Sequence, residues 1–210
     1  MAATVCVYIV DDDEHVRHSI GFMLGTANWS SRAFAGGGAF LAALPRLDPG
    51  CILLDMRMPD VDGMDVLATL ERERIRWPAV VMTGHGETAM AVQAMKLGAI
   101  DFLEKPFDEA LMLSCLERAA VLLKTRAAQT EQEARVKERV GRLTSREREV
   151  LEGLIGGLPN KLIAHRLGIS LRTVEMHRSN MMRKLDAASL AEALQLAGSA
   201  GVRPLARLGD

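Results

Sequence analysis

The amino-acid sequence predicts two domains of different class: an α/β domain with a parallel sheet, followed by an all-helical domain. Over the first 125 residues, short apolar runs alternate with amphipathic stretches, which is the pattern of βαβ units. From Leu143 onward the strand-like runs are absent and capped helical segments follow one another. The charged, proline-free stretch 118–142 is typical of a helical linker.

The α/β part is expected to form a doubly wound, five-stranded parallel sheet. The apolar runs place strands near 4–10, 30–35, 51–54, 79–82 and 100–103. The amphipathic stretches place helices near 14–26, 37–44, 63–75, 87–97 and 108–124. Asp60 and Asp62 follow the third strand beside Pro59 and Gly63, so we expect them to be turn and capping residues.

The segment that leaves the α/β part keeps a heptad-like seam at Leu116, Ala120, Leu123 and Ala127. The seam then decays into polar residues, which argues against a long coiled coil. We therefore expect a helix that overruns the α/β domain and frays.

The all-helical part is expected to contain four helices, because four capping signals precede helical patterns. The caps are Thr144 with Glu147, Asn160, Ser170, and Ser189 with Glu192, and the helices end near Ile155, Leu167, Leu185 and Ser199. Gly168 is the expected left-handed stop of the second helix. The tail Val202–Asp210 is expected to be loose.

The composition limits the classes of function. The 210 residues have a net charge of −1, but residues 1–125 hold 11 Lys and Arg against 17 Asp and Glu, whereas residues 126–210 hold 15 against 10. A basic C-terminal part favours a nucleic-acid partner. No apolar run has the length of a membrane span and no signal-peptide pattern begins the chain, so we expect a cytoplasmic location without membrane contact. Cys6, Cys51 and Cys115 lack metal-ligand spacing and are expected to be free thiols.

Polar residues stand where the predicted strands end. Asp11 and Asp12 follow the first strand, Asp55 the third, Thr83 the fourth and Lys105 the fifth. The carboxyl ends of parallel strands meet at one edge of a sheet, so these side chains are expected to converge. Converging carboxylates repel one another and need a cation, and an all-oxygen site suits Mg²⁺. Asp55 is then a candidate phosphoryl acceptor, with Mg²⁺ and Lys105 neutralising the incoming charge.

Two short helices joined by Gly168-Ile169-Ser170 have the pattern of a helix-turn-helix. Val174, Met181 and Leu185 share the apolar side of the second helix, so its other side is free to enter a major groove. Arg172, Thr173, Met176 and Ser179 are expected to point partly or wholly outward. The cations that could meet phosphates are Lys161, Arg172, Arg178, Arg183 and Lys184. The alternative is an ordinary helical bundle with solvated charges.

The first 125 residues resemble the receiver domain of two-component response regulators. The matching stretches are Ile9–Asp13, Asp55–Gly63, Val81–Gly86 and Glu104–Phe107. The resemblance implies a flavodoxin-like sheet of order 2-1-3-4-5. It implies that Asp55 accepts a phosphoryl group from a sensor histidine kinase.

The resemblance also implies roles for the neighbours of Asp55. Asp12, Asp55 and the backbone carbonyl of Arg57 would ligate Mg²⁺, with Asp11 acting through water. Lys105 would pair with the phosphoryl oxygens, and its bond to Pro106 would be cis. Thr83 and the aromatic Phe102 would form the switch, and we expect the two to stand at adjacent strand ends. Residues 87–103 would rearrange and form a homodimer.

Residues 140–200 resemble the LuxR/NarL-type helix-turn-helix. The matching stretches are Leu143–Leu151, Gly157–Lys161, Ile163-Ala164, Leu167–Ser170, Thr173–Arg178 and Lys184-Leu185. The resemblance implies DNA binding by Asn160–Ser179. Within it Glu175 is acidic where some members are basic, and it would either accept a hydrogen bond from cytosine or repel phosphate. The implied domains are a receiver at 1–120, a linker at 121–140 and a DNA-binding domain at 141–203.

Among response regulators, the sequence is most similar to the FixJ group, on Ile9–Asp12, Thr83–Gly86, Ala91–Lys96 with Gly98-Ala99, Phe102–Phe107, Gly157–Lys161 and Thr173–Arg178. That resemblance implies a transcription activator that binds promoter DNA and works with RNA polymerase, with microaerobic or nitrogen-fixation genes as its targets. Two other functions compete with it. A metal-dependent phosphohydrolase with an Asp nucleophile would need a second carboxylate two residues after Asp55, where this chain has Arg57. A receiver could also serve as a phosphorylation-independent interaction module.

Overall fold

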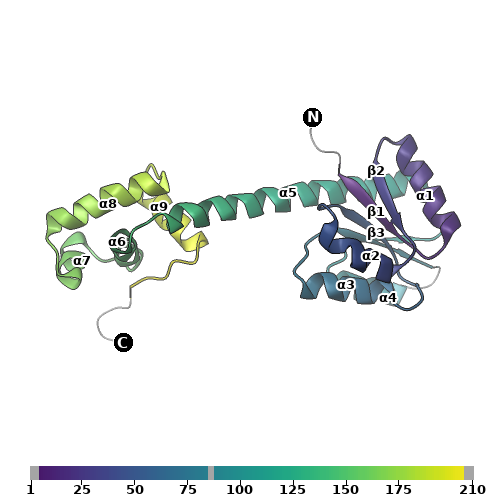
Figure 1. Cartoon of the computed structure of the whole chain (residues 1–210), viewed down its shortest axis with the longest axis horizontal. Helices are drawn as coiled ribbons and strands as arrows, with labels where there is room; N and C mark the ends of the chain where they lie inside the picture. The colour runs from purple at the N-terminus through teal and green to yellow at the C-terminus, as the bar shows by residue number, and fades with distance from the viewer. Residues whose placement is uncertain (1–4, 85–87, 206–210) are drawn as a thin grey trace. The chain divides into compact units, whose positions relative to one another are not determined.

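The structure, a computed structural model, describes residues 5–84 and 88–205 (Figure 1). Tertiary contacts divide the chain into two compact units, with the boundary between Ala127 and Ala128. His85 and Gly86 of the receiver-like motif, and residues 206–210 of the tail, lie outside the described residues.

The first unit is built on one sheet of order β2-β1-β3-β4-β5, in which every neighbouring pair is parallel. This is the predicted doubly wound order, and the fold prediction is confirmed. The strands are β1 Cys6–Val10, β2 Ser30–Phe34, β3 Cys51–Asp55, β4 Ala79–Thr83 and β5 Asp101–Glu104.

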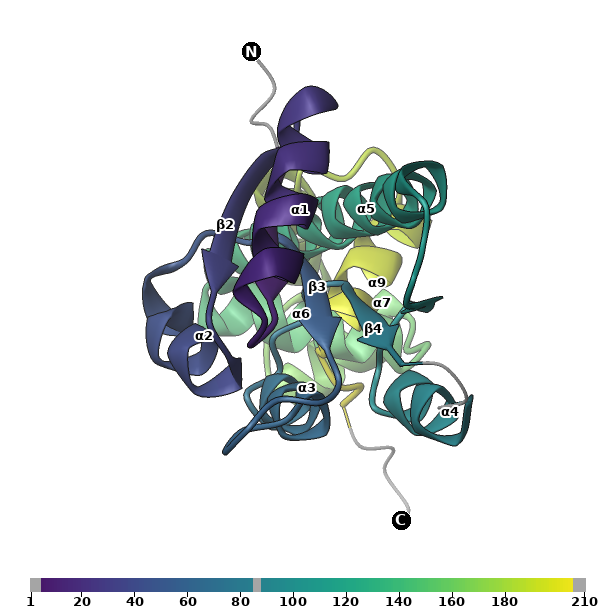
Figure 2. The ribbon, with the colours of Figure 1, turned by 90° about the vertical axis from the view of Figure 1, so that its right-hand side faces the viewer.

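Helices cover both faces of the sheet (Figure 2). The helices of this unit are α1 Glu14–Thr26, α2 Gly37–Ala43 with the short 3₁₀ turn Leu44–Arg46, α3 Gly63–Arg72, α4 Thr88–Lys96 and the start of α5 Glu109–Gly141. One buried cluster joins α1 and α5 to alternate strand residues such as Ile9 and Leu53. A second cluster joins α2, α3 and α4 to the residues between them, such as Val10 and Leu54. Strands covered on both faces need continuous apolar runs, which is why β3 and β4 are buried at every position.

Strand register aligns the ends that carry the polar residues. Val10 pairs with Leu54, so the next residue of each strand, Asp11 and Asp55, emerges at the same edge. Thr83 pairs with Glu104 one residue before Lys105. Phe102 pairs with Val81, two residues before Thr83, so our expectation that Phe102 stands at the strand end beside Thr83 is wrong.

The turn after β3 is closed by short polar residues, as predicted. Asp60 has a positive φ of 66°, and Asp62 is the N-cap of α3 in a reciprocal capping box with Asp65. Gly63 is required by close approach, because a β-carbon there would lie 2.6 Å from the backbone oxygen of Asp55 and 2.9 Å from Cα of Met56. The turn is therefore packed directly against the end of the strand that bears Asp55.

We expect Gly63→Ala to destabilise the first unit by about 1–3 kcal/mol, because the added carbon meets backbone that cannot rotate away. Trp29 and Trp77 are the only tryptophans, so urea unfolding followed by tryptophan fluorescence reports on this unit. Gly25→Ala is the control, since its β-carbon would meet nothing within 4 Å in α1. A Gly63→Ala midpoint equal to that of Gly25→Ala would show that the close approach is not tight.

Helix α5 is one continuous helix of 33 residues, so the expected fraying is wrong. Its first half buries Met112 and Leu116 in the first unit, and Val140 is buried in the second. Residues 127–135 between them are exposed. Two ion pairs stabilise the helix here, each between side chains one turn apart. Glu131–Arg135 lies in the exposed stretch, and Glu138–Arg142 lies in the part that follows it.

The second unit packs the end of α5 with α6 Ser145–Ile155, α7 Asn160–Leu167, α8 Leu171–Leu185 and α9 Leu190–Ser199. Its buried cluster includes Val150, Leu151, Val174, Met181 and Leu185. Among the described residues, no helix is long and apolar enough to cross a membrane.

Most predicted caps of this unit are present, with two corrections, and a third correction concerns the tail. Thr144 with Glu147 forms the capping box of α6, Ser170 caps α8, and Gly168 has the left-handed φ of 64°. The N-cap of α7 is Pro159, so Asn160 is the first helical residue rather than the cap. Ser189 caps α9, but Glu192 accepts from the backbone of Ala188 rather than closing a box on Ser189. The tail is held up to Leu205, whose N–H donates to the carbonyl of Glu152.

Candidate functional site

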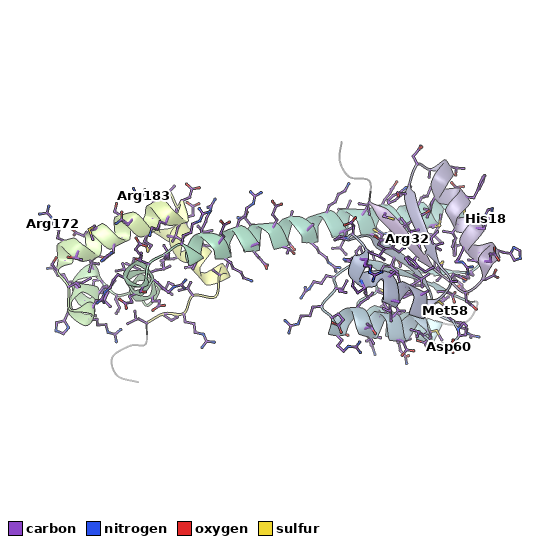
Figure 3. The ribbon with its side chains drawn as sticks, viewed as in Figure 1. His18, Arg32, Met58, Asp60, Arg172 and Arg183 are labelled. Atoms are coloured by element: carbon purple, nitrogen blue, oxygen red, sulfur yellow. The ribbon has the colours of Figure 1, made fainter. Side chains whose placement is uncertain are left out.

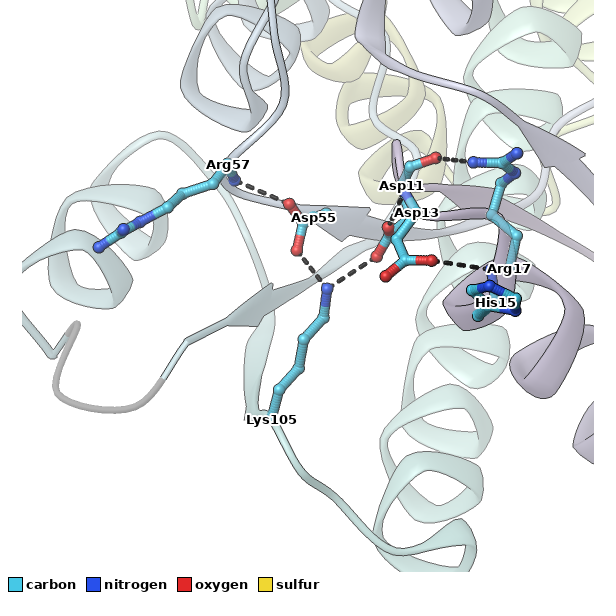
Figure 4. A network of polar contacts seen from close by, with 7 residues as sticks. All are labelled: Asp11, Asp13, His15, Arg17, Asp55, Arg57 and Lys105. Atoms are coloured by element: carbon cyan, nitrogen blue, oxygen red, sulfur yellow. Dashed lines mark hydrogen bonds and ion pairs between the residues drawn. The ribbon is translucent and has the colours of Figure 1, made fainter.

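The ammonium of Lys105 lies between two carboxylates at the carboxyl edge of the sheet (Figure 4). Its Nζ is 2.7 Å from Oδ2 of Asp11 and 2.5 Å from Oδ1 of Asp55. Asp11 and Asp55 are almost fully buried, whereas Lys105 is partly exposed. Lys105 is 94 residues from Asp11 in sequence, and Asp55 is 44 residues from Asp11. The fold brings these three side chains together, as the strand-end pattern predicts.

Backbone amides hold the remaining carboxylate oxygens. Oδ1 of Asp11 accepts from the N–H of Asp13, and Oδ2 of Asp55 accepts from the N–H of Arg57, both at 2.8 Å. Arg17 donates to the carbonyl of Asp11 at 2.8 Å, a contact that no sequence motif indicated. Each carboxylate is therefore fixed by one backbone bond and one charged bond, which gives the site a defined geometry before any ligand binds.

The electrostatics of the site show a shortage of positive charge. Burial raises the pKa of Asp55, and the nearby Asp11 raises it further, although the hydrogen bond and charge of Lys105 act in the opposite direction. Burial disfavours the charged form of Lys105, but hydrogen bonds to Asp11 and Asp55 outweigh it and raise the pKa of Lys105. Two carboxylates share one ammonium, so a further cation would be stabilised there.

The donor set fits Mg²⁺ only with help from water and backbone. Within residues 5–84 and 88–205, no group of three or more His, Cys, Asp or Glu side chains is placed to hold a metal ion. Asp11 and Asp55 converge, whereas Asp12 is exposed. Mg²⁺ is normally bound by one or two carboxylates and keeps several waters, so a site with few carboxylate ligands is compatible with it.

The predicted switch residues differ in exposure. Thr83 is 3% exposed at the end of β4, and its carbonyl accepts from the N–H of Lys105 at 2.8 Å. Phe102 is 46% exposed on β5. The Lys105–Pro106 peptide is cis, as the family resemblance implied. A single backbone hydrogen bond thus links Thr83 to Lys105.

In the second unit, α8 has a buried side and an opposite exposed side. At 100° per residue, Arg172, Met176, Ser179 and Arg183 lie directly opposite the buried Val174, Met181 and Leu185. Figure 3 shows Arg172 and Arg183 projecting from the two ends of this helix. Glu175 is also exposed, and Lys161 is exposed on α7. On α8 these residues form an exposed, largely polar face opposite an anchored one, and Lys161 adds an exposed cation on α7.

Three of the residues predicted to contact DNA are not simply exposed: two contact other side chains of the second unit, and one is partly buried. The ammonium of Lys184 is 2.7 Å from Oε2 of the buried Glu147, which gives it a structural role. The hydroxyl of Thr173 is 2.8 Å from Oγ of Ser170 in the cap of α8. Arg178 is partly buried and lies nearer the apolar side than Arg172 does.

The Glu147–Lys184 pair makes the stability of the second unit pH-dependent. Burial disfavours ionisation of Glu147, but hydrogen bonds from Lys184 and from the backbone and hydroxyl of Thr144 outweigh it and hold the pKa of Glu147 below its usual range. A carboxyl whose pKa is lower in the folded state stabilises that state above its unfolded pKa of about 4.3. This stabilisation is lost as the pH falls from about 4.3 through the lower folded pKa.

We expect Glu147→Gln to lower the stability of α6 and α8 by about 1–3 kcal/mol at pH 7, because it leaves Lys184 without its carboxylate. Hydrogen exchange of the amides in these helices measures the effect locally. Arg146→Gln, which removes only the exposed pair with Glu149, is the control. The wild-type advantage should shrink below pH 4.3, and an advantage that persists unchanged there would exclude the charged pair as its source.

Family comparisons agree with the two-unit architecture. Residues 7–117 match the model of the response regulator receiver domain. Residues 141–197 match the model of bacterial regulatory proteins of the LuxR family. The chain belongs to the LuxR-class response regulators. Receiver domains generally bind Mg²⁺ at the phosphorylation site, and they imply a sensor kinase as partner, while the LuxR-type domain implies DNA binding.

Curated relatives place this response regulator with FixJ. The transcriptional regulatory protein FixJ of Bradyrhizobium diazoefficiens is 45% identical over 93% of this chain and 96% of its own length. FixJ of Rhizobium meliloti is 42% identical over 94% of this chain and 97% of its own length. DctR of Rhodobacter capsulatus, a C4-dicarboxylate transport transcriptional regulatory protein, is 38% identical over 89% of this chain and 95% of its own.

Solved structures give the same relationship. The response regulator StyR matches with a TM-score of 0.81 and 38% identity, covering 93% of this chain and 99% of StyR. Full-length FixJ from B. japonicum matches with a TM-score of 0.59 and 43% identity, covering 94% of this chain and 97% of FixJ. The chain is therefore a FixJ-like response regulator, and neither the phosphohydrolase nor the interaction module is favoured.

Proposed function

We propose that Asp55 is the phosphoacceptor of this response regulator. The observation that carries the proposal is the position of the Lys105 ammonium, which lies 2.5 Å from Asp55 and 2.7 Å from Asp11. A phosphoryl group added to Asp55 brings about −1.5 to −2 charges, which Lys105 is placed to neutralise. Asp11 is the second carboxylate that contacts the same ammonium.

The reaction is a transfer between two nucleophiles. An oxygen of the Asp55 carboxylate attacks phosphorus, and a P–O bond forms as the P–N bond to the kinase histidine breaks. The histidine leaves with the electron pair of that bond and takes up a proton. The product at Asp55 is a mixed anhydride, and the N–H of Arg57 remains positioned to donate to its carboxyl side. Lys105 holds charge and does not donate its proton in this step.

Mg²⁺ is the cofactor that we propose for the site. Asp55 and Asp12 would hold it with the backbone carbonyl of Arg57, and Asp11 would act through water. When bound, it would supply the positive charge that two carboxylates and one ammonium lack.

The output that we propose is a phosphorylation-dependent homodimer formed through α4 and β5. Thr83 is buried beside the site, whereas Phe102, Val92 and Met95 are exposed on those two elements. A hydroxyl drawn toward the phosphoryl group would shift the end of β4, and the neighbouring strand β5 would respond with a change in the exposed face that carries Phe102. Two DNA-binding units held together gain affinity for paired half-sites through effective concentration.

We expect Thr83→Ala to retain phosphorylation but to weaken phosphorylation-dependent dimerisation, because the hydroxyl that senses the phosphoryl group is missing. Sedimentation equilibrium of acetyl-phosphate-treated protein measures the dimer dissociation constant. Thr83→Ser, which keeps the hydroxyl, is the control. A Thr83→Ala protein that dimerises as tightly as the wild type would remove Thr83 from the switch.

The proposed biological output is activation of transcription in the cytoplasm, through promoter DNA and RNA polymerase. Microaerobic or nitrogen-fixation genes are the proposed targets, on the basis of the likeness to FixJ. Comparing transcripts of a strain that lacks this gene with its parent, in air and at low oxygen, tests that assignment. Equal transcripts of such genes in both strains would refute it.

A further inference from the structure

A basic cleft lies at the opposite edge of the sheet from Asp55, where β4 begins. It has a volume of about 670 Å³, within the range of small-molecule sites. The end of α3, the segment before β4, the end of α4 and one residue of α5 form its walls. It is lined by Leu67, Leu70, Glu71, Arg74, Ile75, Arg76, Trp77, Ala79, Lys96, Leu97, Gly98 and Arg126.

The charges of the cleft differ from those of its unit. Four cations, Arg74, Arg76, Lys96 and Arg126, face one carboxylate, Glu71. Residues 1–125 as a whole are acidic, with 17 Asp and Glu against 11 Lys and Arg. Among the residues described, Arg74, Arg76 and Lys96 form no ion pair with a carboxylate. Unpaired cations gathered in a concave, partly apolar wall raise the local concentration of anions.

The backbone of the cleft is fixed. Arg74 has a left-handed φ of 56° at the end of α3, where the N–H of Ile75 donates to the carbonyl of Leu70 at 2.8 Å. Arg126 on α5 donates to the carbonyl of Arg76 at 2.8 Å and so ties the segment to that helix. Trp77 stacks on Tyr8 with ring centroids 5.5 Å apart, which fixes the indole in the wall. The cationic side chains thus stand on a rigid support.

We propose that this cleft binds a small organic anion that carries phosphate groups. The cleft has four cations and one carboxylate, so its net charge suits a ligand with two or three negative charges. A ligand with a single carboxylate group would carry too little charge. Arginine forks match phosphate oxygens in pairs, and the apolar wall formed by Leu70, Ile75 and Trp77 accommodates an organic part. The cleft shares no residue with the phosphoacceptor site. The proposed anion would therefore bind at a place separate from the phosphoryl group on Asp55.

The test is a titration of the ¹⁵N-labelled full-length chain in Mg²⁺-free buffer, with the indole N–H of Trp77 as the local probe. Trp29→Phe identifies the Trp77 signal, since the chain has two tryptophans. The probes are inorganic pyrophosphate, ADP and citrate. We expect saturable shifts with pyrophosphate and ADP, and weaker binding of citrate. A citrate affinity equal to or above that of both phosphates would overturn the ligand class.

Matched variants separate a site from general charge attraction. Arg74→Gln with Arg76→Gln should weaken pyrophosphate binding by about tenfold or more, because two charge-assisted contacts are lost. Arg72→Gln is the control, since Arg72 pairs with Glu73 and does not line the cleft; it should change the affinity by less than about twofold. Equal weakening by both, or no saturation up to about 10 mM, would show that there is no site.

Discussion

Replacing Asp55 with asparagine is expected to abolish Mg²⁺-dependent phosphorylation by acetyl phosphate or by a kinase. The amide keeps the shape of the side chain, so the hydrogen bond from the backbone of Arg57 can be retained. It removes the nucleophilic charge. Among the described carboxylates, Asp11 is the one other that combines burial, strand-end placement and contact with Lys105. Phosphoryl uptake, measured as the fraction of phosphorylated protein on phosphate-affinity gels, should fall to background.

Asp60→Asn is the matched control for this prediction. Asp60 lies five residues away in the exposed turn after β3, where Figure 3 labels it. Its replacement should leave phosphorylation unchanged. Asp12→Ala should raise the Mg²⁺ concentration needed for half-maximal uptake, because it removes a proposed oxygen ligand. Full labelling of Asp55→Asn would place the acceptor elsewhere.

The second large effect is expected at the exposed face of α7 and α8. Lys161→Ala and Arg172→Ala should weaken binding to specific and scrambled DNA alike, because phosphate contacts carry no sequence information. Each lost phosphate contact should reduce the slope of log K against log salt by about one. Titrations of DNA at two or more salt concentrations measure that slope. Arg178→Ala should have a smaller effect on it, since Arg178 is partly buried on the other side of α8.

Arg135→Ala is the control for the basic face. Arg135 is exposed on α5 and paired with Glu131, far along the chain from the helix-turn-helix. Thr173→Ala and Met176→Ala should instead alter base preference, by about 1–3 kcal/mol at any position that is read directly. Unchanged slopes for both Lys161→Ala and Arg172→Ala would mean that this face does not meet DNA.

The sequence predicted the fold because its signals are local and repeated. Continuous apolar runs marked strands covered on both faces, and the residue that ends each run was enough to gather Asp11, Asp55 and Lys105. Capping boxes at Asp62 and Thr144 are likewise encoded within four residues. Such features follow from chain geometry alone.

Features that depend on distant packing could not be predicted. The sequence predicted Lys184 as a phosphate contact, but in the fold it forms an ion pair with Glu147, 37 residues earlier. The fraying expected of α5 followed from its decaying apolar seam, but local helix bonds and ion pairs support the stretch instead. The position of Phe102 relative to Thr83 depends on the register of β5 against β4, which cannot be read from either strand by itself. The sequence therefore could not show that Phe102 lies before the strand end.

The measurement that tests the central claim most directly is chemical trapping of the phosphorylated residue. Borohydride reduces an acyl phosphate, so the modified aspartate can be located by mass spectrometry of peptides from the phosphorylated full-length chain. The account predicts reduction at Asp55 in the wild type and at no residue in Asp55→Asn. Reduction at Asp11 or Asp12, or a stable phosphate on a hydroxyl instead of a carboxylate, would contradict it.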